Sequence, residues 1–122
     1  MNHNNMVKLY GCCLETCLPI FIYEFMPNGT LFHSLHGGTA LNKNLKWSYR
    51  LRVATDIAYA LSYMHNDLSK PVVHRDVRSL GTLLDQSFSA KLASFGFSVS
   101  ITPGEKPKKW PVQGTPGYID PE

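Results

Sequence analysis

Residues 72–96, VVHRDVRSLGTLLDQSFSAKLASFG, decide the fold of this 122-residue chain. The stretch contains three short apolar runs, Val72-Val73, Thr82-Leu83-Leu84 and Ala90-Lys91-Leu92, which are separated by polar turns such as Asp85-Gln86-Ser87. Short runs of this kind, bounded by turn-forming residues, are typical of β-strands. The stretch therefore predicts three short strands joined by turns and loops.

A helix is predicted before this stretch, over residues 47–66. Apolar residues recur there at spacings of three and four, which is the period of an amphipathic helix. Arg50, Arg52 and Asp56 occupy the opposite face, and the polar residues that precede Pro71 end the helix. The apolar face is expected to consist of Trp47, Leu51, Ala54, Ile57, Ala58, Leu61 and Met64.

The outer parts of the chain predict a β-hairpin at one end and a long loop at the other. Residues 7–13 and 18–25 are rich in strand-forming side chains, and they are expected to pair. The sequence MPNG at residues 26–29 has strong turn chemistry, and Thr30 can cap a short helix over residues 31–36. Residues 94–122 are rich in Pro and Gly and predict a long loop, a type of segment that is often functional.

Composition and charge argue against several classes of protein. With 43% hydrophobic and 17% charged residues, the chain is too apolar to be disordered. The formal net charge of +3 is small, and one basic cluster, Lys106, Lys108 and Lys109, does not predict a nucleic-acid partner. The longest nearly apolar run, residues 17–23, is far shorter than the roughly 20 residues that a bilayer span needs. The three cysteines are bunched near one another and indicate reduced thiols rather than a disulfide framework.

Three short motifs follow one another in the second half of the chain: His74-Arg75-Asp76, Ser94-Phe95-Gly96 and Asp120-Pro121-Glu122. Protein kinases place a catalytic loop H-R-D-x-x-x-x-N before a D-F-G motif and end the activation segment with A-P-E. One such triplet alone would be a weak signal, but here three occur in the family's order and spacing. The chain therefore resembles the catalytic core of a protein kinase.

Further stretches narrow the resemblance to plant receptor-like kinases of the wall-associated type and their cytoplasmic pseudokinase relatives, the ZED-related group. These stretches are LYGCCLE at 9–15, YEFMPNGTL at 23–31 and GTPGYIDPE at 114–122. The resemblance implies an α+β, protein-kinase-like fold, as a fragment from strands 4–5 and the hinge of the N-lobe through the first part of the C-lobe to the activation segment. It divides the chain into an N-lobe remnant with the hinge, a C-lobe part with the long helix and catalytic loop, and the activation segment, at residues 1–26, 27–93 and 94–122.

The resemblance assigns a role to each matching residue. Asp76 stands at the proton-acceptor position, Arg78 replaces a Lys that contacts the transferring phosphate, and Thr115 is the activation-segment Thr that approaches the catalytic base. The nucleotide-binding positions are the gatekeeper Tyr23, the hinge residues Glu24 and Met26, and Leu83 beneath the adenine. The structural motif positions are His74, Arg75, Phe95, Gly96 and Glu122, with His74 and Phe95 stacked in the hydrophobic spine.

Two positions depart from the kinase pattern. Gly81 replaces the Asn that binds a second Mg²⁺, and Ser94 replaces the Asp of D-F-G. Mg²⁺ prefers anionic or carbonyl oxygens in tight octahedral geometry. Gly81 has no side-chain oxygen, and Ser94 offers only a neutral hydroxyl. The resemblance allows ATP as a cofactor, but these two positions argue against Mg²⁺.

Three functions remain open at this point. The first is a catalytically impaired kinase fragment, a pseudokinase, that binds other proteins in plant signalling or immunity, in the cytoplasm or at the cytoplasmic face of the plasma membrane. Kinases or immune receptors are the partners that the resemblance implies. The second is an active Ser/Thr kinase that transfers phosphate from ATP to protein, with its Gly-rich loop and V-A-I-K Lys outside this sequence. The third is a truncated, non-functional product, whose spine residues and long helix would lack their partners.

Overall fold

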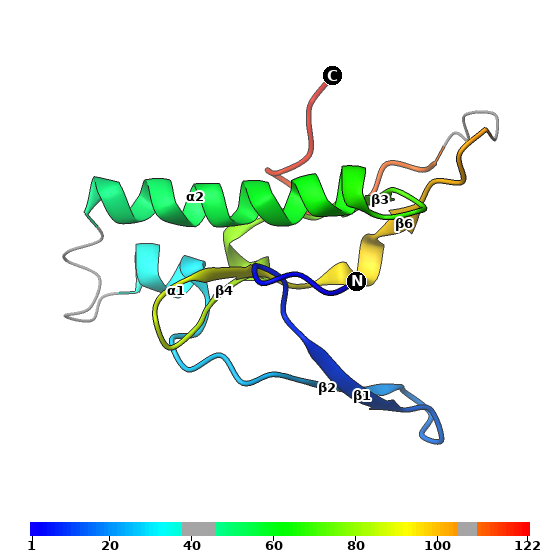
Figure 1. Cartoon of the computed structure of the whole chain (residues 1–122), viewed down its shortest axis with the longest axis horizontal. Helices are drawn as coiled ribbons and strands as arrows, with labels where there is room; N and C mark the ends of the chain where they lie inside the picture. The colour runs from blue at the N-terminus through cyan, green and yellow to red at the C-terminus, as the bar shows by residue number, and fades with distance from the viewer. Residues whose placement is uncertain (38–45, 105–109) are drawn as a thin grey trace.

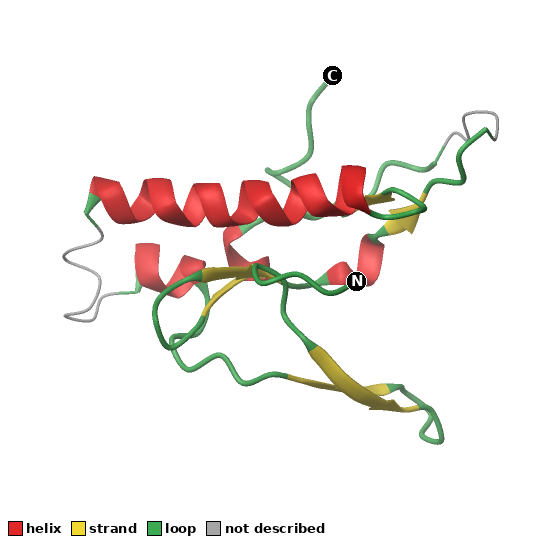
Figure 2. Ribbon diagram, viewed as in Figure 1, coloured by secondary structure: helices red, strands yellow, loops and turns green. Residues whose placement is uncertain are grey.

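The computed structural model describes residues 1–37, 46–104 and 110–122. It has a small α+β architecture (Figure 2). Within these ranges the strands pair as three two-stranded antiparallel ladders, β1–β2, β3–β6 and β4–β5. The elements in chain order (Figure 1) are β1 (Leu9–Cys13), β2 (Ile20–Tyr23), α1 (Leu31–His36), α2 (Trp47–Ser62), β3 (Val72–Val73), β4 (Thr82–Leu84), β5 (Ala90–Leu92) and β6 (Val99–Ser100).

The core lies between α2 and the β4–β5 ladder. Val53, Ile57 and Ala60 of α2 are buried, and Met64 continues the same strip in the π-helical turn Tyr63–Asp67 that follows the helix. In β4 and β5 the first and third residues are buried, as the two-residue period of a strand requires. The core is completed on the strand side by Met6, Leu84, Ala90 and Leu92.

The predicted apolar face of the helix is partly wrong. Ile57 and Met64 do enter the core, but Trp47 is 71% exposed and Leu51 is 49% exposed. Spacings of three and four also connect the residues that are buried, so α2 carries two neighbouring apolar strips and periodicity cannot rank them. The second strip lines an open groove beside α1 and the loop after β3, with Ala54, Ala58, Leu61, Leu31 and Val77 among its walls.

Asp56 also differs from its predicted place on the polar face. It is half-buried, and its carboxylate accepts a hydrogen bond of 2.8 Å from the backbone N–H of the fully buried Ala90. A buried N–H without an acceptor is costly, and the Asp56 carboxylate supplies the acceptor for the N–H of the first residue of β5. Asp56 therefore joins α2 to the strand ladder that it covers.

The β1–β2 hairpin was predicted, and it extends away from α2 (Figure 1). Both strands are shorter than expected. β1 begins at Leu9 because the preceding residues lie along β5, where the Val7 N–H donates to the Leu92 carbonyl at 2.9 Å. β2 begins at Ile20 because Pro19 has no N–H to offer the ladder.

The segment that follows Ser94 is mostly irregular, as predicted, but its first part is ordered by β3. After a 3₁₀ turn at Phe95–Phe97, β6 pairs with β3, with Val99 opposite Val73. A strand of two residues has no periodicity to detect, so the sequence did not reveal it. The short helix α1 is capped as expected, since Thr30 Oγ1 accepts a hydrogen bond from the His33 N–H at 3.1 Å.

Two expectations concern membranes and basic surfaces. In the part of the chain that the structure describes, no helix has the length and hydrophobicity needed to cross a membrane. The basic cluster at Lys106, Lys108 and Lys109 lies outside the described residues.

Replacing Asp56 with Ala is expected to destabilise the chain by about 1–3 kcal/mol, because it leaves the buried Ala90 N–H without an acceptor. Asp56→Asn keeps an acceptor oxygen and should cost less. Urea unfolding followed by circular dichroism measures both, with Asp67→Ala, at an exposed carboxylate, as the matched control. Equal stabilities for Asp56→Ala and Asp67→Ala would contradict the role given to Asp56.

Candidate functional site

The loop between β3 and β4 begins with a buried and fully hydrogen-bonded histidine. His74 Nδ1 accepts a hydrogen bond from the Asp76 N–H at 3.2 Å, so its Nε2 carries the proton that is donated to the Ala93 carbonyl at 2.8 Å. Burial lowers the pKa of His74 and outweighs the Ala93 contact and the nearby Asp76 charge, which both raise it. The ring is therefore neutral at pH 7, and it fixes the loop against the end of β5.

The carboxylate of Asp76 joins this loop to the long segment that follows Ser94. One oxygen, Oδ1, accepts from Thr115 Oγ1 at 2.6 Å and from the Thr115 N–H at 3.1 Å. The other, Oδ2, accepts from Arg78 Nε at 2.9 Å. Burial raises the pKa of Asp76, but the hydrogen bonds from Thr115 and Arg78 and the Arg78 charge outweigh it and lower the pKa. Asp76 is thus an ionised carboxylate with a donor on each oxygen.

The same segment approaches the loop at two further points. Gly114 has a φ of 148°, and a Cβ at this position would lie 2.9 Å from the Arg75 carbonyl oxygen, so the close approach requires glycine. Tyr118 Oη lies 3.1 Å from Ser79 Oγ. Between loop and segment is a cavity of about 290 Å³, whose lining includes Arg75, Asp76, Val77, Gln113, Thr115 and Tyr118.

Gly81 and Ser94 face each other at the ends of the β4–β5 ladder. The Ala93 N–H donates to the Gly81 carbonyl at 2.8 Å, and a Cβ on Gly81 would lie 3.4 Å from Ser94 Oγ. Together the two positions supply one neutral hydroxyl and no carboxylate. No group of three or more His, Cys, Asp or Glu in the described ranges could hold a metal ion. The side chains at positions 81 and 94 do not fit Mg²⁺, which binds through one or two carboxylates together with phosphate oxygens and water.

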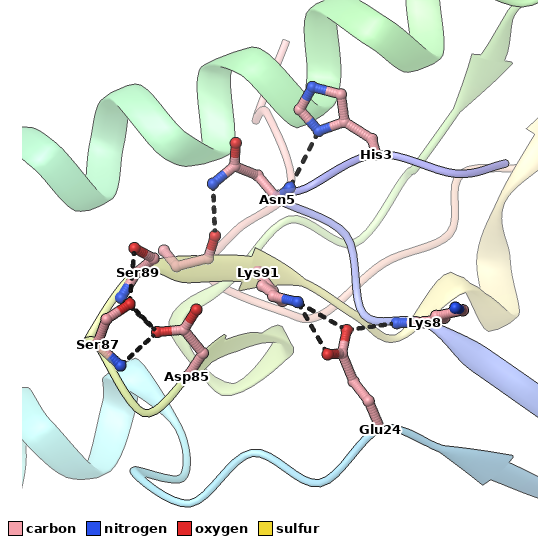
Figure 3. A network of polar contacts seen from close by, with 9 residues as sticks. His3, Asn5, Lys8, Glu24, Asp85, Ser87, Ser89 and Lys91 are labelled. Carbon is pink, nitrogen blue, oxygen red and sulfur yellow. Dashed lines mark hydrogen bonds and ion pairs between the residues drawn. The ribbon is translucent and has the colours of Figure 1, made fainter.

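The turn after β2 carries an ion pair that sequence reasoning missed. Glu24 lies 2.8 Å from Lys91 Nζ of β5, and its Oε1 also accepts from the Lys8 N–H at 2.7 Å (Figure 3). Burial raises the pKa of Glu24, but the contacts with Lys91 and Lys8 outweigh it and lower the pKa. The pair is 67 residues apart in sequence, so no local spacing indicates it.

Two backbone groups near this ion pair have no hydrogen-bond partner in the part of the chain that the structure describes. The Glu24 N–H donates to the Lys8 carbonyl, and the buried Met26 accepts from the Gly29 N–H. Among the described residues, however, nothing hydrogen-bonds to the Glu24 carbonyl or to the Met26 N–H. Tyr23 is 46% exposed at the end of β2, and Leu83 is half-buried on β4.

The remaining motif residues are placed as follows. Phe95 lies edge to face with His74, with ring centroids 5.2 Å apart. Gly96 is exposed in the 3₁₀ turn that follows Ser94. Glu122 is exposed, and its N–H donates to Asp120 Oδ1 at 3.1 Å.

Comparison with known proteins identifies the family. A profile described as protein tyrosine and serine/threonine kinase matches residues 1–117. The chain belongs to the protein kinase family. It is 47% identical over all 122 residues to wall-associated receptor kinases 1 and 3 of Arabidopsis thaliana, and 48% identical to wall-associated receptor kinase-like 17 of the same plant. It covers 16% of the length of each of these relatives.

As a member of the kinase family, the chain has the expected α+β fold of a kinase fragment. The kinase motifs and the stretch at 114–122 contain residues that meet in space: Asp76 and Thr115 touch, and so do His74 and Phe95. The resemblance placed Arg78 at a position that contacts the transferring phosphate. In the structure the Arg78 side chain donates to Asp76 instead. The contacts of Tyr118 with Ser79 and of Lys91 with Glu24 were not predicted, because a sequence motif does not specify which residues its members contact.

The lowered pKa of His74 predicts a pH dependence of stability. In the unfolded chain a His has a pKa of about 6.5, so below that pH protons bind the unfolded state in preference to the folded one. The free energy of unfolding should therefore fall as the pH drops from about 7.5 to about 5.5. This range lies above the pKa values of the lowered carboxyl groups, which stay ionised in both states.

Urea unfolding at several pH values measures this effect. His74→Gln keeps a donor for the Ala93 carbonyl but does not titrate, so its stability should change much less over the same range. An identical pH slope in the original chain and in His74→Gln would show that His74 is not the responsible group.

Proposed function

We propose that this kinase-family chain is part of a catalytically impaired kinase, a pseudokinase, that acts by binding other proteins. The pair of Gly81 and Ser94 carries the proposal, because it supplies one neutral hydroxyl where the kinase motifs have an Asn and an Asp. Metal ions stabilise the charge on a transferring phosphoryl group by several kcal/mol, and each ~1.4 kcal/mol of barrier is about tenfold in rate. Loss of both metal-binding side chains should therefore lower the rate of phosphoryl transfer by orders of magnitude.

The rest of the site supports a retained scaffold. His74 and Asp76 are buried and satisfied, and Thr115 closes on Asp76 at 2.6 Å. The free Glu24 carbonyl and Met26 N–H are suited to the edge of an adenine, with Leu83 beneath the ring, so ATP remains the proposed nucleotide and would bind without Mg²⁺. On the same basis we propose residues 1–26 as N-lobe and hinge, 27–93 as C-lobe and 94–122 as activation segment.

The partners would be proteins rather than nucleic acids. Kinases or immune receptors of plant signalling are proposed because the relatives are named receptor kinases. The same names support a place in the cytoplasm, at the inner face of the plasma membrane, where the intracellular part of a receptor would lie.

One observation favours the alternative of an active Ser/Thr kinase. Asp76 is ionised, and Thr115 meets it with both its hydroxyl and its N–H, which is the arrangement expected around a working proton acceptor. In that case the missing metal-binding side chains would have to be replaced by groups outside this chain.

A chimeric kinase that carries this chain distinguishes the pseudokinase from the active kinase. The chain would replace the 122 matching residues of wall-associated receptor kinase 1, and transfer of phosphate from ATP to a protein substrate would be measured. We expect activity to fall at least about a hundredfold relative to the parent. Gly81→Asn with Ser94→Asp should restore much of it, since a Cβ at position 81 makes contacts of ordinary length with Ser94.

The matched control is Gly81→Ala with Ser94→Ala, which changes the same two positions without supplying a metal ligand and should stay inactive. A graft that phosphorylates at the parent's rate, and loses that activity on Asp76→Ala, would establish the active kinase instead.

A further inference from the structure

The turn at residues 26–30, which follows β2, is hydrogen-bonded to the end of β4 in both directions. The Asn28 N–H donates to the Leu84 carbonyl at 3.3 Å, and the Leu84 N–H donates back to the Gly29 carbonyl at 2.9 Å. Asn28 Nδ2 adds a third bond, of 2.6 Å, to the Asp85 carbonyl. The turn and the end of β4 therefore form one hydrogen-bonded unit.

The side chain of Asn28 does more than shape the turn. Asn is common in turns because its side chain can bond the backbone two residues on, and Gly29 supplies the left-handed conformation, with a φ of 64°. The Asn28 amide, however, donates to a carbonyl 57 residues away in sequence, on another element of the fold. Turn chemistry therefore explains the glycine but not the contact of Asn28 with Asp85.

Leu83 lies on the face of β4 that is turned away from α2. Its neighbours Thr82 and Leu84 are buried in the core, and successive side chains of a strand point to opposite faces. Leu83 is paired with Lys91 of β5, whose Nζ lies 2.8 Å from Glu24. In Figure 1 the chain after β2 runs on this side of the ladder. Leu83 therefore faces the segment that follows β2.

The same turn holds Met26, two residues beyond Glu24. The Gly29 N–H donates to the carbonyl of the buried Met26 at 3.2 Å. The Met26 N–H has no hydrogen-bond partner among the described residues. Because the turn is bonded to β4, the position of this N–H relative to Leu83 depends on how firmly the turn is held.

We propose that Asn28 is a positioning residue for adenine, and that it holds the Met26 N–H in line with a base lying on Leu83. This inference rests on the proposed function, in which adenine lies between these two groups. Hydrogen bonds weaken steeply when donor and acceptor are misaligned. Without the Asn28 amide the turn keeps its backbone bonds but loses its contact with Asp85, so the Met26 N–H is less well aligned with the edge of the base.

Titration of the complete 122-residue chain with ATP and with ITP, in EDTA, tests this role. ATP and ITP share their ribose and phosphates and differ only at the edge of the base. Adenine presents an acceptor nitrogen and an amino group there, whereas the base of ITP presents an N–H and a carbonyl. NMR signals of the backbone amides give both dissociation constants, and the ITP constant divided by the ATP constant is the preference for adenine.

We expect ATP to shift the Met26 N–H signal of the original chain, and the preference for adenine to fall about fivefold in Asn28→Ala and in Asn28→Asp. Both variants lack the amide donor, and Asp keeps the preference for a turn. Asn28→Gln retains an amide and should recover part of the preference. The matched control is Asn5→Ala, which removes a bond of the same kind, from Asn5 Nδ2 to the Ala90 carbonyl at 3.0 Å, and should leave the preference unchanged.

Two results would overturn the role of Asn28 and leave ATP as the nucleotide. The first is an unchanged preference in Asn28→Ala and Asn28→Asp, and the second is an equal loss of preference in Asn5→Ala, which would make the effect one of general destabilisation. Should the amide signals of α2 show that Asn28→Ala is unfolded, Asn28→Asp decides. Equal affinity of the original chain for ATP and ITP, or a Met26 N–H signal that ATP does not shift, would overturn the proposed adenine site and the role of Asn28 with it.

Discussion

The buried carboxylate of Asp76 is the constraint on which the rest of the site depends. An ionised carboxylate away from water is costly unless donors reach both of its oxygens. Arg78 supplies one donor from the same loop, and Thr115 supplies two from a segment 39 residues away. The segment must therefore return to the loop, and that return in turn requires glycine at position 114, where it passes the Arg75 carbonyl.

Positions 81 and 94, where kinases have metal-binding side chains, take no part in the hydrogen bonds of the Asp76 carboxylate. Gly81 and Ser94 are connected through the backbone bond from the Ala93 N–H to the Gly81 carbonyl, which involves neither side chain. The core contacts come from other residues of β4 and β5. The core formed by α2, β4 and β5 therefore does not include the side chains at these two positions.

Local patterns in the sequence predicted the elements well where the deciding forces are local. The strands at 72–73, 82–84 and 90–92 were found at their observed bounds because turn residues enclose them. The buried strip of α2 was misjudged because Val53 and Ala60 obey the same spacing as the residues that were chosen. Contacts between distant residues, such as Asp56 with the Ala90 N–H or Arg75 with the Pro111 carbonyl, leave no periodic trace. The kinase resemblance anticipated the contacts of Asp76 with Thr115 and of His74 with Phe95, but contacts such as that of Arg78 with Asp76 required the structure.

We propose that the site keeps its hydrogen-bonded frame without metal-binding side chains at Gly81 and Ser94. The most direct measurement is a titration of the chain with Mn²⁺ in the presence of ATP, read by electron paramagnetic resonance of the bound ion, for the original chain and for Gly81→Asn with Ser94→Asp. We expect the original chain to leave the Mn²⁺–ATP spectrum unchanged and the double variant to produce a protein-bound signal. A protein-bound signal of equal strength from the original chain would contradict it.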